Sequence, residues 1–136
     1  MMHALDAKTL VARRQIAPGD LPAIAAAGVK IVVNNRPDGE EKGQPCSAEI
    51  EAAARAAGIG YRHIPVAGGF NGDDVLAMAE ALDAAAEGKL LAFCRSGTRS
   101  TFLWALARAE RGAMAEETVA AAAAAGYDLG PIRGLL

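Results

Sequence analysis

Short apolar runs that alternate with glycine-bounded, alanine-rich segments constrain the fold of this chain more than any other feature. Residues 29–34 (VKIVVN) and 89–93 (KLLAF) have the length and aliphatic content of buried strands. Residues 59–66 (IGYRHIPV) predict a further strand, and residues 8–16 predict an edge strand. Strands that alternate with helices favour an α/β fold with a central, mainly parallel sheet and helices on both faces.

Helix start and stop signals lie between these strands. The segment PGDLPAIAAAG predicts a helix that Asp20 opens and Gly28 closes. The other predicted helices are residues 47–57 with Ser47 as N-cap, a helix from Asp73 or Asp74 to about Glu87, residues 98–111, and residues 115–125 before Gly126. Segments 35–45 and 67–72 are rich in turn formers and predict loops.

Length and composition limit the class of protein. With 136 residues, 52% of them hydrophobic and 22% charged, residues 1–136 are expected to form a single packed domain. A formal net charge of −2 leaves no broad basic surface for nucleic acid. Because the N-terminus lacks a signal-peptide core and no stretch approaches the length of a membrane span, we expect a cytoplasmic protein without a membrane partner.

The cysteines and histidines indicate free thiols rather than a disulfide or a metal site. In a reducing compartment Cys46 and Cys94 are each interpreted as a free thiol. His3 and His63 show no metal-ligand spacing with either cysteine. We therefore expect no metal ion and no cofactor.

The segment 94–100 (CRSGTRS) joins the strand 89–93 to the helix 98–111 and places a thiol at a helix N-terminus. The first N–H groups of a helix have no intrahelical partner and carry a partial positive charge. A loop of small residues can direct such groups at one centre and so cradle an oxyanion. Gly97 allows a close approach, and the planar guanidinium of Arg99 suits an oxyanion.

The same surroundings favour the thiolate form of Cys94. The helix terminus and the nearby guanidinium should lower the pKa of the thiol below its ordinary value. A thiolate beneath a bound oxyanion is a nucleophile that faces its electrophile, and the Ser100 hydroxyl could donate to the sulfur. The alternative is a cysteine that serves as a small hydrophobic residue before a solvated turn. The ordered combination of strand, cysteine, glycine, arginine and helix favours the functional interpretation.

Two known active-site loops resemble this segment. Protein tyrosine and dual-specificity phosphatases carry a cysteine, five residues, an arginine, and then serine or threonine. Rhodanese-type sulfurtransferases carry a cysteine and a shorter loop. Four residues separate Cys94 from Arg99, so the loop length alone is more similar to rhodanese.

The wider chain resembles a bacterial family, the phosphatase-like domain of beta-lactamase hydrolase-like proteins. The resemblance rests on VVNNRPDGEE at 32–41, QP at 44–45, the strand ending in HIPV, CRSGTRS and the late AAGYDL, and it spans roughly residues 8–130. It implies a fold like that of dual-specificity phosphatases. The family has also been labelled sulfur transferase, and its domain is sometimes fused to a metallo-hydrolase of sulfur metabolism. A functional link to such an enzyme is therefore expected.

The resemblance also implies a role for each residue of the segment. Cys94 would be the nucleophile, Arg99 the oxyanion clamp and Ser100 the partner of the thiolate. The phosphate-binding cradle would be formed by the amides of Arg95, Ser96, Gly97 and Thr98.

Two departures from the tyrosine phosphatase pattern concern proton chemistry. Phe93 stands where those enzymes place a histidine, and AGG follows HIPV where a general-acid aspartate is usual. Replacement acids are available at Asp38, Glu40, Glu41, Asp73 and Asp74. Asp38 is the candidate catalytic acid, with a turn residue in RPDG as its alternative. Asp73 and Asp74 are better explained as N-caps.

Three further residues have two interpretations each. Arg36 is either a second positive charge for the oxyanion or an ion-pair partner of Glu40 or Glu41. His63 is expected to bond to backbone within its strand rather than to carry a proton. Cys46 is expected to be a buried thiol, although it could resolve an oxidised Cys94.

Three functions remain open from the sequence. The leading one is a cysteine-dependent phosphatase that hydrolyses phosphate monoesters through a phosphocysteine intermediate. The second is a rhodanese-like sulfurtransferase that forms a persulfide on Cys94, and the third is a non-enzymatic oxyanion or redox sensor. The expected ligand is a small oxyanion or phosphoester.

Overall fold

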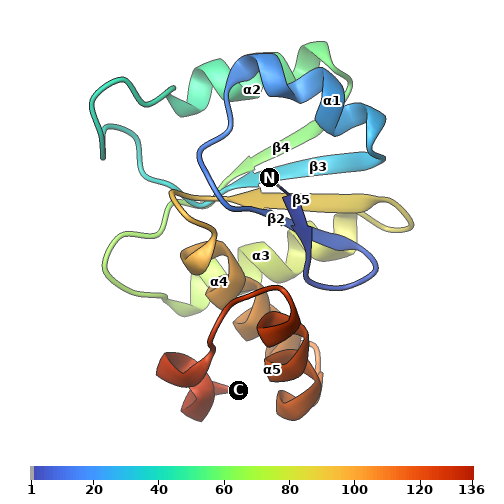
Figure 1. Cartoon of the computed structure of the whole chain (residues 1–136), viewed down its shortest axis with the longest axis vertical. Coiled ribbons are helices and arrows are strands. Elements are labelled where there is room, and N and C mark those ends of the chain that lie inside the picture. Colours follow the sequence, from blue (N-terminus) through green and yellow to red (C-terminus); the bar gives the residue numbers. More distant parts are fainter. Residues whose placement is uncertain (1) are drawn as a thin grey trace.

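A five-stranded sheet forms the centre of the computed structural model, which describes residues 2–136 (Figure 1). The strands are β1 (Met2–Ala4), β2 (Thr9–Ala12), β3 (Val29–Asn34), β4 (Gly60–His63) and β5 (Lys89–Phe93). Their order in the sheet is β1-β2-β5-β3-β4, with β1 antiparallel to β2 and every other pair parallel. The predicted α/β class and the mainly parallel sheet are confirmed.

Helices cover both faces of the sheet, as predicted. The helical elements are η1 (Pro18–Asp20), α1 (Leu21–Ala26), α2 (Ser47–Ala56), α3 (Gly72–Ala84), α4 (Thr98–Glu110), α5 (Ala115–Ala124) and η2 (Gly130–Leu135). Helices α1 and α2 lie on one side, and α3, α4 and α5 lie on the other (Figure 1).

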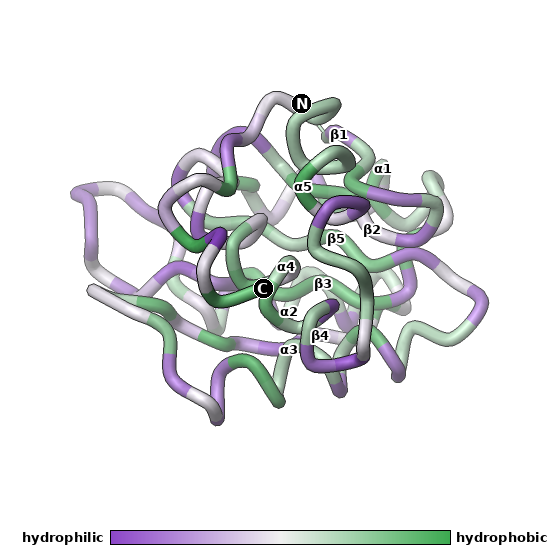
Figure 2. Tube along the Cα trace, turned by 90° about the horizontal axis from the view of Figure 1, so that it is seen from below, coloured by the Kyte–Doolittle hydropathy of each residue, from purple (hydrophilic) through white to green (hydrophobic). Residues whose placement is uncertain are grey.

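The central strand β5 divides the apolar core into two layers. Because successive side chains of a strand point to opposite faces, Leu91 and Phe93 pack toward α1 and α2, whereas Leu90 and Ala92 pack toward α3 and α4. The second layer also holds Trp104 of α4, which is fully buried. The outlying loops are largely hydrophilic, and hydrophobic segments run through the centre of the molecule (Figure 2).

The predicted edge strand at residues 8–16 is wrong in position and in length. Strand β2 is only Thr9–Ala12, and it is the second strand because β1 pairs with its outer side. Burial agrees with an inner position, since Thr9, Val11 and Ala12 are all buried. A three-residue strand such as β1 is too short to show a hydrophobic period, and it was not predicted.

Two predicted helix caps are also wrong. The N-cap of α2 is Cys46, so Ser47 is the first helical residue and its N–H donates to Asp38 Oδ1 at 2.8 Å. The N-cap of α3 is Asn71, whose Oδ1 accepts the Asp74 N–H at 2.8 Å. Helix α3 ends at Ala84 rather than near residue 87.

Candidate functional site

The loop at residues 94–100 connects β5 to α4, as predicted, and holds the Cys94 sulfur beneath the first turn of the helix. Cys94 is only 1% exposed. Gly97 is the N-cap of α4 with a φ of +92°, and its N–H donates to Cys94 Sγ at 3.1 Å. A φ in this range favours glycine, so Gly97 permits the turn that directs its N–H at the sulfur.

Hydrogen-bond donors around Cys94 control its protonation. Burial raises the pKa of the thiol, but the backbone and hydroxyl of Ser100 and the N–H groups of Ser96 and Gly97 act against burial. Their combined effect exceeds that of burial and places the Cys94 pKa below its ordinary value. The lowered pKa predicted from sequence therefore has a cause in the loop itself, although Phe93 replaces the histidine of tyrosine phosphatases.

Arg99 lies beside this sulfur and is held by two neighbours. Its Nη1 donates to Val66 O at 3.0 Å and to Glu40 Oε2 at 2.7 Å, and its Nη2 donates to Glu40 Oε1 at 2.9 Å. The hydrogen bond to Glu40 is the chief cause that raises the Arg99 pKa; burial lowers it, and the Cys94 thiolate contributes to the rise. Glu40 therefore fixes one edge of the guanidinium while the group remains next to Cys94.

Arg36 is held in ion pairs with two glutamates. Its side chain is 2% exposed, and Nε and Nη2 donate to Glu40 and Glu41 at 2.8 and 2.9 Å. Its Nη1 donates to Gln15 Oε1 at 3.0 Å. Of the two interpretations of Arg36, the structure shows the ion pair; because Arg36 also lines the same cavity as Arg99, its contact with an oxyanion stays a prediction.

Charged side chains line the mouth of the site, a cavity of about 340 Å³ formed by Arg36, Glu40, Glu41, Arg95 and Arg99. The Arg95 side chain is 71% exposed and approaches Glu41 at 4.0 Å. The two glutamates offset much of the positive charge of the arginines.

The predicted proton donors occupy other roles. Asp38 accepts the Ser47 N–H at the start of α2 and does not line the mouth, so its geometry supports a structural role. The hydrogen bond from Arg99 lowers the Glu40 pKa to about 2, burial opposes this, and Arg36 adds to the lowering. Glu41 is shifted in the same direction, chiefly by its hydrogen bond with Arg36. Both glutamates are therefore ionised at neutral pH.

The remaining predicted site residues lie apart from the sulfur's donors. Asp74 completes the capping box of α3, and Asp73 lies in the same first turn. His63 Nε2 lies 2.9 Å from Arg36 O, which confirms its predicted bond to backbone. Cys46 is half-buried, and its Sγ lies 3.3 Å from Glu49 Oε1.

Two residues that support the loop were not predicted. The Tyr127 hydroxyl donates to Ser96 O at 2.9 Å, and Asn35 Oδ1 accepts the Ser100 hydroxyl at 2.8 Å. Both occur in motifs that carry the family resemblance, VVNNRPDGEE and AAGYDL. No spacing rule connects either residue to the loop, because both contacts depend on the tertiary fold.

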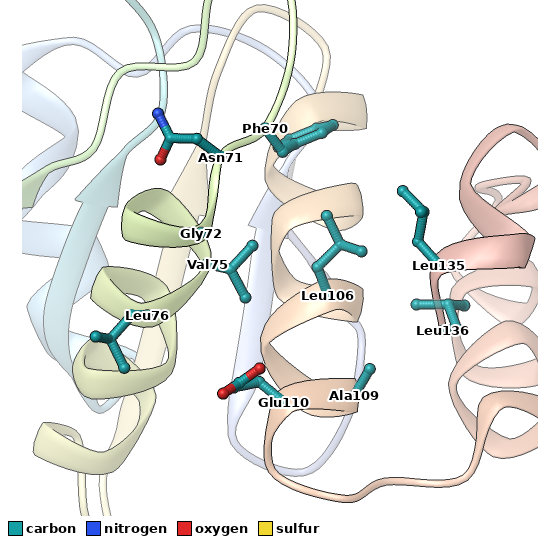
Figure 3. A pocket seen from close by; sticks show the side chains of 10 residues that line it. All are labelled: Phe70, Asn71, Gly72, Val75, Leu76, Leu106, Ala109, Glu110, Leu135 and Leu136. Carbon is teal, nitrogen blue, oxygen red and sulfur yellow. The ribbon is translucent and has the colours of Figure 1, made fainter.

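An apolar groove of about 580 Å³ lies between α3, α4 and the C-terminal residues (Figure 3). Its walls include Val75 and Leu76 of α3, Leu106 of α4, and Leu135 with Leu136. It shares no lining residue with the charged mouth.

Metal and membrane features were sought over residues 2–136. No group of three or more His, Cys, Asp or Glu side chains there is arranged to hold a metal ion. No helix in that part of the chain is long and apolar enough to cross a membrane.

A comparison with known protein families identifies the family of this chain. Residues 4–113 match the family described as beta-lactamase hydrolase-like protein, phosphatase-like domain. The chain belongs to this family. The family resemblance predicted from the sequence is thereby confirmed, and of its motifs only AAGYDL lies beyond the matched residues.

Curated members of the family are much longer than the region they share with this chain. The beta-lactamase hydrolase-like protein of Xylella fastidiosa is 42% identical over 108 residues, which cover 78% of this chain and 25% of that protein. The corresponding protein of Agrobacterium fabrum is 43% identical over 91 residues, which cover 66% of this chain and 21% of its own length. The shared domain is thus about a quarter of these relatives.

Solved structures confirm the phosphatase-like fold. A phosphatase candidate from Neisseria meningitidis is 36% identical, with a TM-score of 0.78 over 96% of this chain and 92% of its own. The active form of Tk-PTP is 18% identical, with a TM-score of 0.75 over 98% of this chain and 90% of its own. Kinase-associated phosphatase is 14% identical, with a TM-score of 0.72 over 87% and 75% of the two chains. The last two likenesses show the fold alone, which is that of cysteine-type phosphatases.

Replacing Gly97 with alanine should destabilise the protein and distort the loop. An added Cβ would lie 2.8 Å from Ala12 O and 2.2 Å from the Tyr127 hydroxyl, at a φ that disfavours alanine. We expect the free energy of unfolding to fall by about 1–3 kcal/mol, measured by urea denaturation. Gly39→Ala is the matched control, because Gly39 also has a positive φ but no atom near its Cβ position. Equal losses in the two variants would contradict the close packing of the loop.

Replacing Glu40 with glutamine should reduce stability at neutral pH by about 1–2 kcal/mol, because charge-assisted hydrogen bonds to two arginines are lost. Folding lowers the Glu40 pKa from 4.5 to about 2, so its stabilisation is present above about pH 4.5 and is lost as pH falls toward 2. The difference between parent and variant, measured by urea denaturation across this range, should narrow accordingly. Glu51→Gln is the control, since Glu51 pairs with the exposed Arg55. A difference that does not change with pH would contradict this assignment.

Proposed function

We propose that the protein is a cysteine-dependent phosphatase that hydrolyses phosphate monoesters through a phosphocysteine intermediate on Cys94. The observation that carries this proposal is the Cys94 sulfur, which lies beneath the start of α4 and accepts the Gly97 N–H at 3.1 Å. The family and the fold of its structural relatives support the same reaction class. The proposed ligand is a small oxyanion or phosphoester.

In the first step the Cys94 thiolate attacks phosphorus. A sulfur–phosphorus bond forms, the bond from phosphorus to the ester oxygen breaks, and the leaving oxyanion takes a proton from water. The loop amides of residues 95–98 and the Arg99 guanidinium would hold the phosphoryl oxygens during this transfer. In the second step water attacks phosphorus, the sulfur–phosphorus bond breaks, and inorganic phosphate leaves with the thiolate restored.

A rhodanese-like sulfurtransferase is the second candidate, favoured by the ionised state of the glutamates at the mouth. The Cys94 thiolate would attack the outer sulfur of thiosulfate, so that a sulfur–sulfur bond forms and sulfite leaves. The persulfide would then give its outer sulfur to cyanide and release thiocyanate. This sequence requires no general acid, which agrees with a Glu40 pKa of about 2.

We also propose that this domain acts beside a metallo-hydrolase of sulfur metabolism in the cytoplasm. The greater length of the curated relatives supports a partner for the domain, and two free thiols are compatible with a reducing compartment. Co-purification from the native cell and fractionation of that cell test the two statements. A protein recovered alone, or found outside the cytoplasm, would contradict them.

Two assays run in parallel distinguish the candidate reactions. Aryl phosphate hydrolysis should exceed the background by at least about 100-fold and disappear in Cys94→Ser, because the nucleophile is lost. Thiosulfate-to-cyanide transfer that depends on Cys94 would instead favour the sulfurtransferase. An added mass of one phosphoryl group or one sulfur atom on Cys94 identifies the intermediate. If neither rate exceeds that of Cys94→Ser, both enzyme proposals fail and a sensor remains.

The missing proton donor should make the phosphatase rate depend strongly on the leaving group. Aryl phosphates with acidic phenols should react at least about 100-fold faster than alkyl phosphates, because an alkoxide leaves poorly without protonation. Steady-state kcat/KM for a series of phenyl phosphates of graded phenol pKa measures this dependence. Equal rates for aryl and alkyl esters would indicate a general acid other than the glutamates that line the mouth.

A further inference from the structure

A buried hydroxyl next to the nucleophile has one proton and two acceptors. Ser100 and Asn35 are fully buried, and Cys94 is 1% exposed. The Ser100 hydroxyl donates to Asn35 Oδ1 at 2.8 Å. Ser100 belongs to the first turn of α4, directly after the loop that holds the Cys94 sulfur. Burial raises the pKa of the Cys94 thiol, and the backbone and hydroxyl of Ser100 act against burial and help to lower it. Since a hydroxyl carries a single proton, it cannot donate to both acceptors at once.

The orientation of the Asn35 amide is fixed by its other contacts. Its Nδ2 donates to Ile64 O at 3.0 Å. Its backbone N–H donates to Phe93 O at 2.8 Å, and its backbone O accepts the Val66 N–H at 3.0 Å. A flipped amide would place Oδ1 against the carbonyl oxygen of Ile64, so that two acceptors would face each other. Asn35 must therefore present an acceptor, not a donor, to Ser100.

We propose that Asn35 is a positioning residue for the nucleophile, whose amide oxygen competes with the Cys94 sulfur for the single hydroxyl proton of Ser100. In the thiol form, Ser100 donates to Asn35. When Cys94 ionises, rotation about the Cβ–Oγ bond turns the same hydroxyl proton toward the thiolate, and no proton passes between the residues. Asn35 Oδ1 then loses its partner while buried, and this cost opposes thiolate formation.

The same rotation would follow the charge on sulfur through turnover. Formation of a covalent bond to sulfur removes the negative charge, and the hydroxyl returns to Asn35; departure of the group restores the charge and draws the hydroxyl back. This part deepens the proposed function and rests on it. The competition for the proton does not, because it exists in the free protein.

Three other ionisable groups near the sulfur do not change their ionisation state over the pH range of the experiment. Arg99 has a pKa raised chiefly by its hydrogen bond to Glu40, and Tyr127 has a pKa raised chiefly by burial. Glu40, on the far side of Arg99, has a pKa of about 2. Between about pH 5 and 9 the reactivity of the sulfur therefore reports the ionisation of Cys94.

A double-mutant cycle on the rate of alkylation tests the competition. The rate of Cys94 modification by iodoacetamide is measured against pH for the parent, Asn35→Ala, Ser100→Ala and the double variant, with the Cys94 peptide resolved from the Cys46 peptide by mass spectrometry. Ser100→Ala should raise the apparent pKa of Cys94, and Asn35→Ala should lower it, each by about half a unit or more. The double variant should match Ser100→Ala, because Asn35 acts only through the hydroxyl.

Two results of this cycle would contradict the proposal. If Asn35→Ala shifts the pKa by the same amount with and without Ser100, or raises it, Asn35 acts through the structure of the loop and the proposal is wrong. The cycle needs no turnover. A cycle that behaves as expected in a protein lacking both enzyme activities overturns the proposed function alone, and an additive cycle in an active enzyme overturns this inference alone.

Discussion

The hydrogen bond from the Gly97 N–H to the Cys94 sulfur is the interaction on which the candidate site depends. It forms because strand β5 ends at Phe93, Gly97 adopts a left-handed conformation in the loop that follows, and α4 begins at the next residue. The two core layers fix both ends of this short connection, since β5 is the central strand and α4 packs beneath the sheet. A thiol that would otherwise be neutral in an apolar interior thereby meets several donors.

A second constraint is the balance of charge at the mouth. Glu40 forms ion pairs with the buried Arg36 and with Arg99. The carboxylate that holds the Arg99 guanidinium is therefore itself held by Arg36. The same pairing leaves Glu40 ionised. Glu40 is therefore part of the structure that holds Arg99 in place.

Elements with a strong local signal were predicted closely. Strands β3 and β5 match the runs VKIVVN and KLLAF residue for residue, because aliphatic runs of that length have few alternatives once helices flank them. The start of α4 was predicted at Thr98, directly after Gly97, which is the N-cap in the structure. The short β1 was missed because three residues show no hydrophobic period. The Asn71 cap was missed because Asp73 and Asp74 nearby have a similar preference for the cap position.

The supporting contacts of the site are of a different kind. Asn35 and Tyr127 reach the loop, and Gln15 reaches Arg36, from segments far apart in the chain that only the folded sheet brings together. Arg36 could be assigned two roles from its neighbours in sequence. The structure shows one of them, the ion pair, at a side chain whose nearly complete burial no local pattern encodes.

The hydrogen bond between Tyr127 and Ser96 has a mechanical consequence. Tyr127 follows α5 and lies beyond the stretch that matches the family, yet its hydroxyl donates a hydrogen bond to the carbonyl oxygen of Ser96 in the loop around Cys94. The guanidinium of Arg13 lies over the Tyr127 ring, 5.0 Å from the ring centroid. A displacement of the polypeptide after α5 would therefore also move the Ser96 carbonyl and, through the short loop, the Gly97 N–H that donates to the Cys94 sulfur.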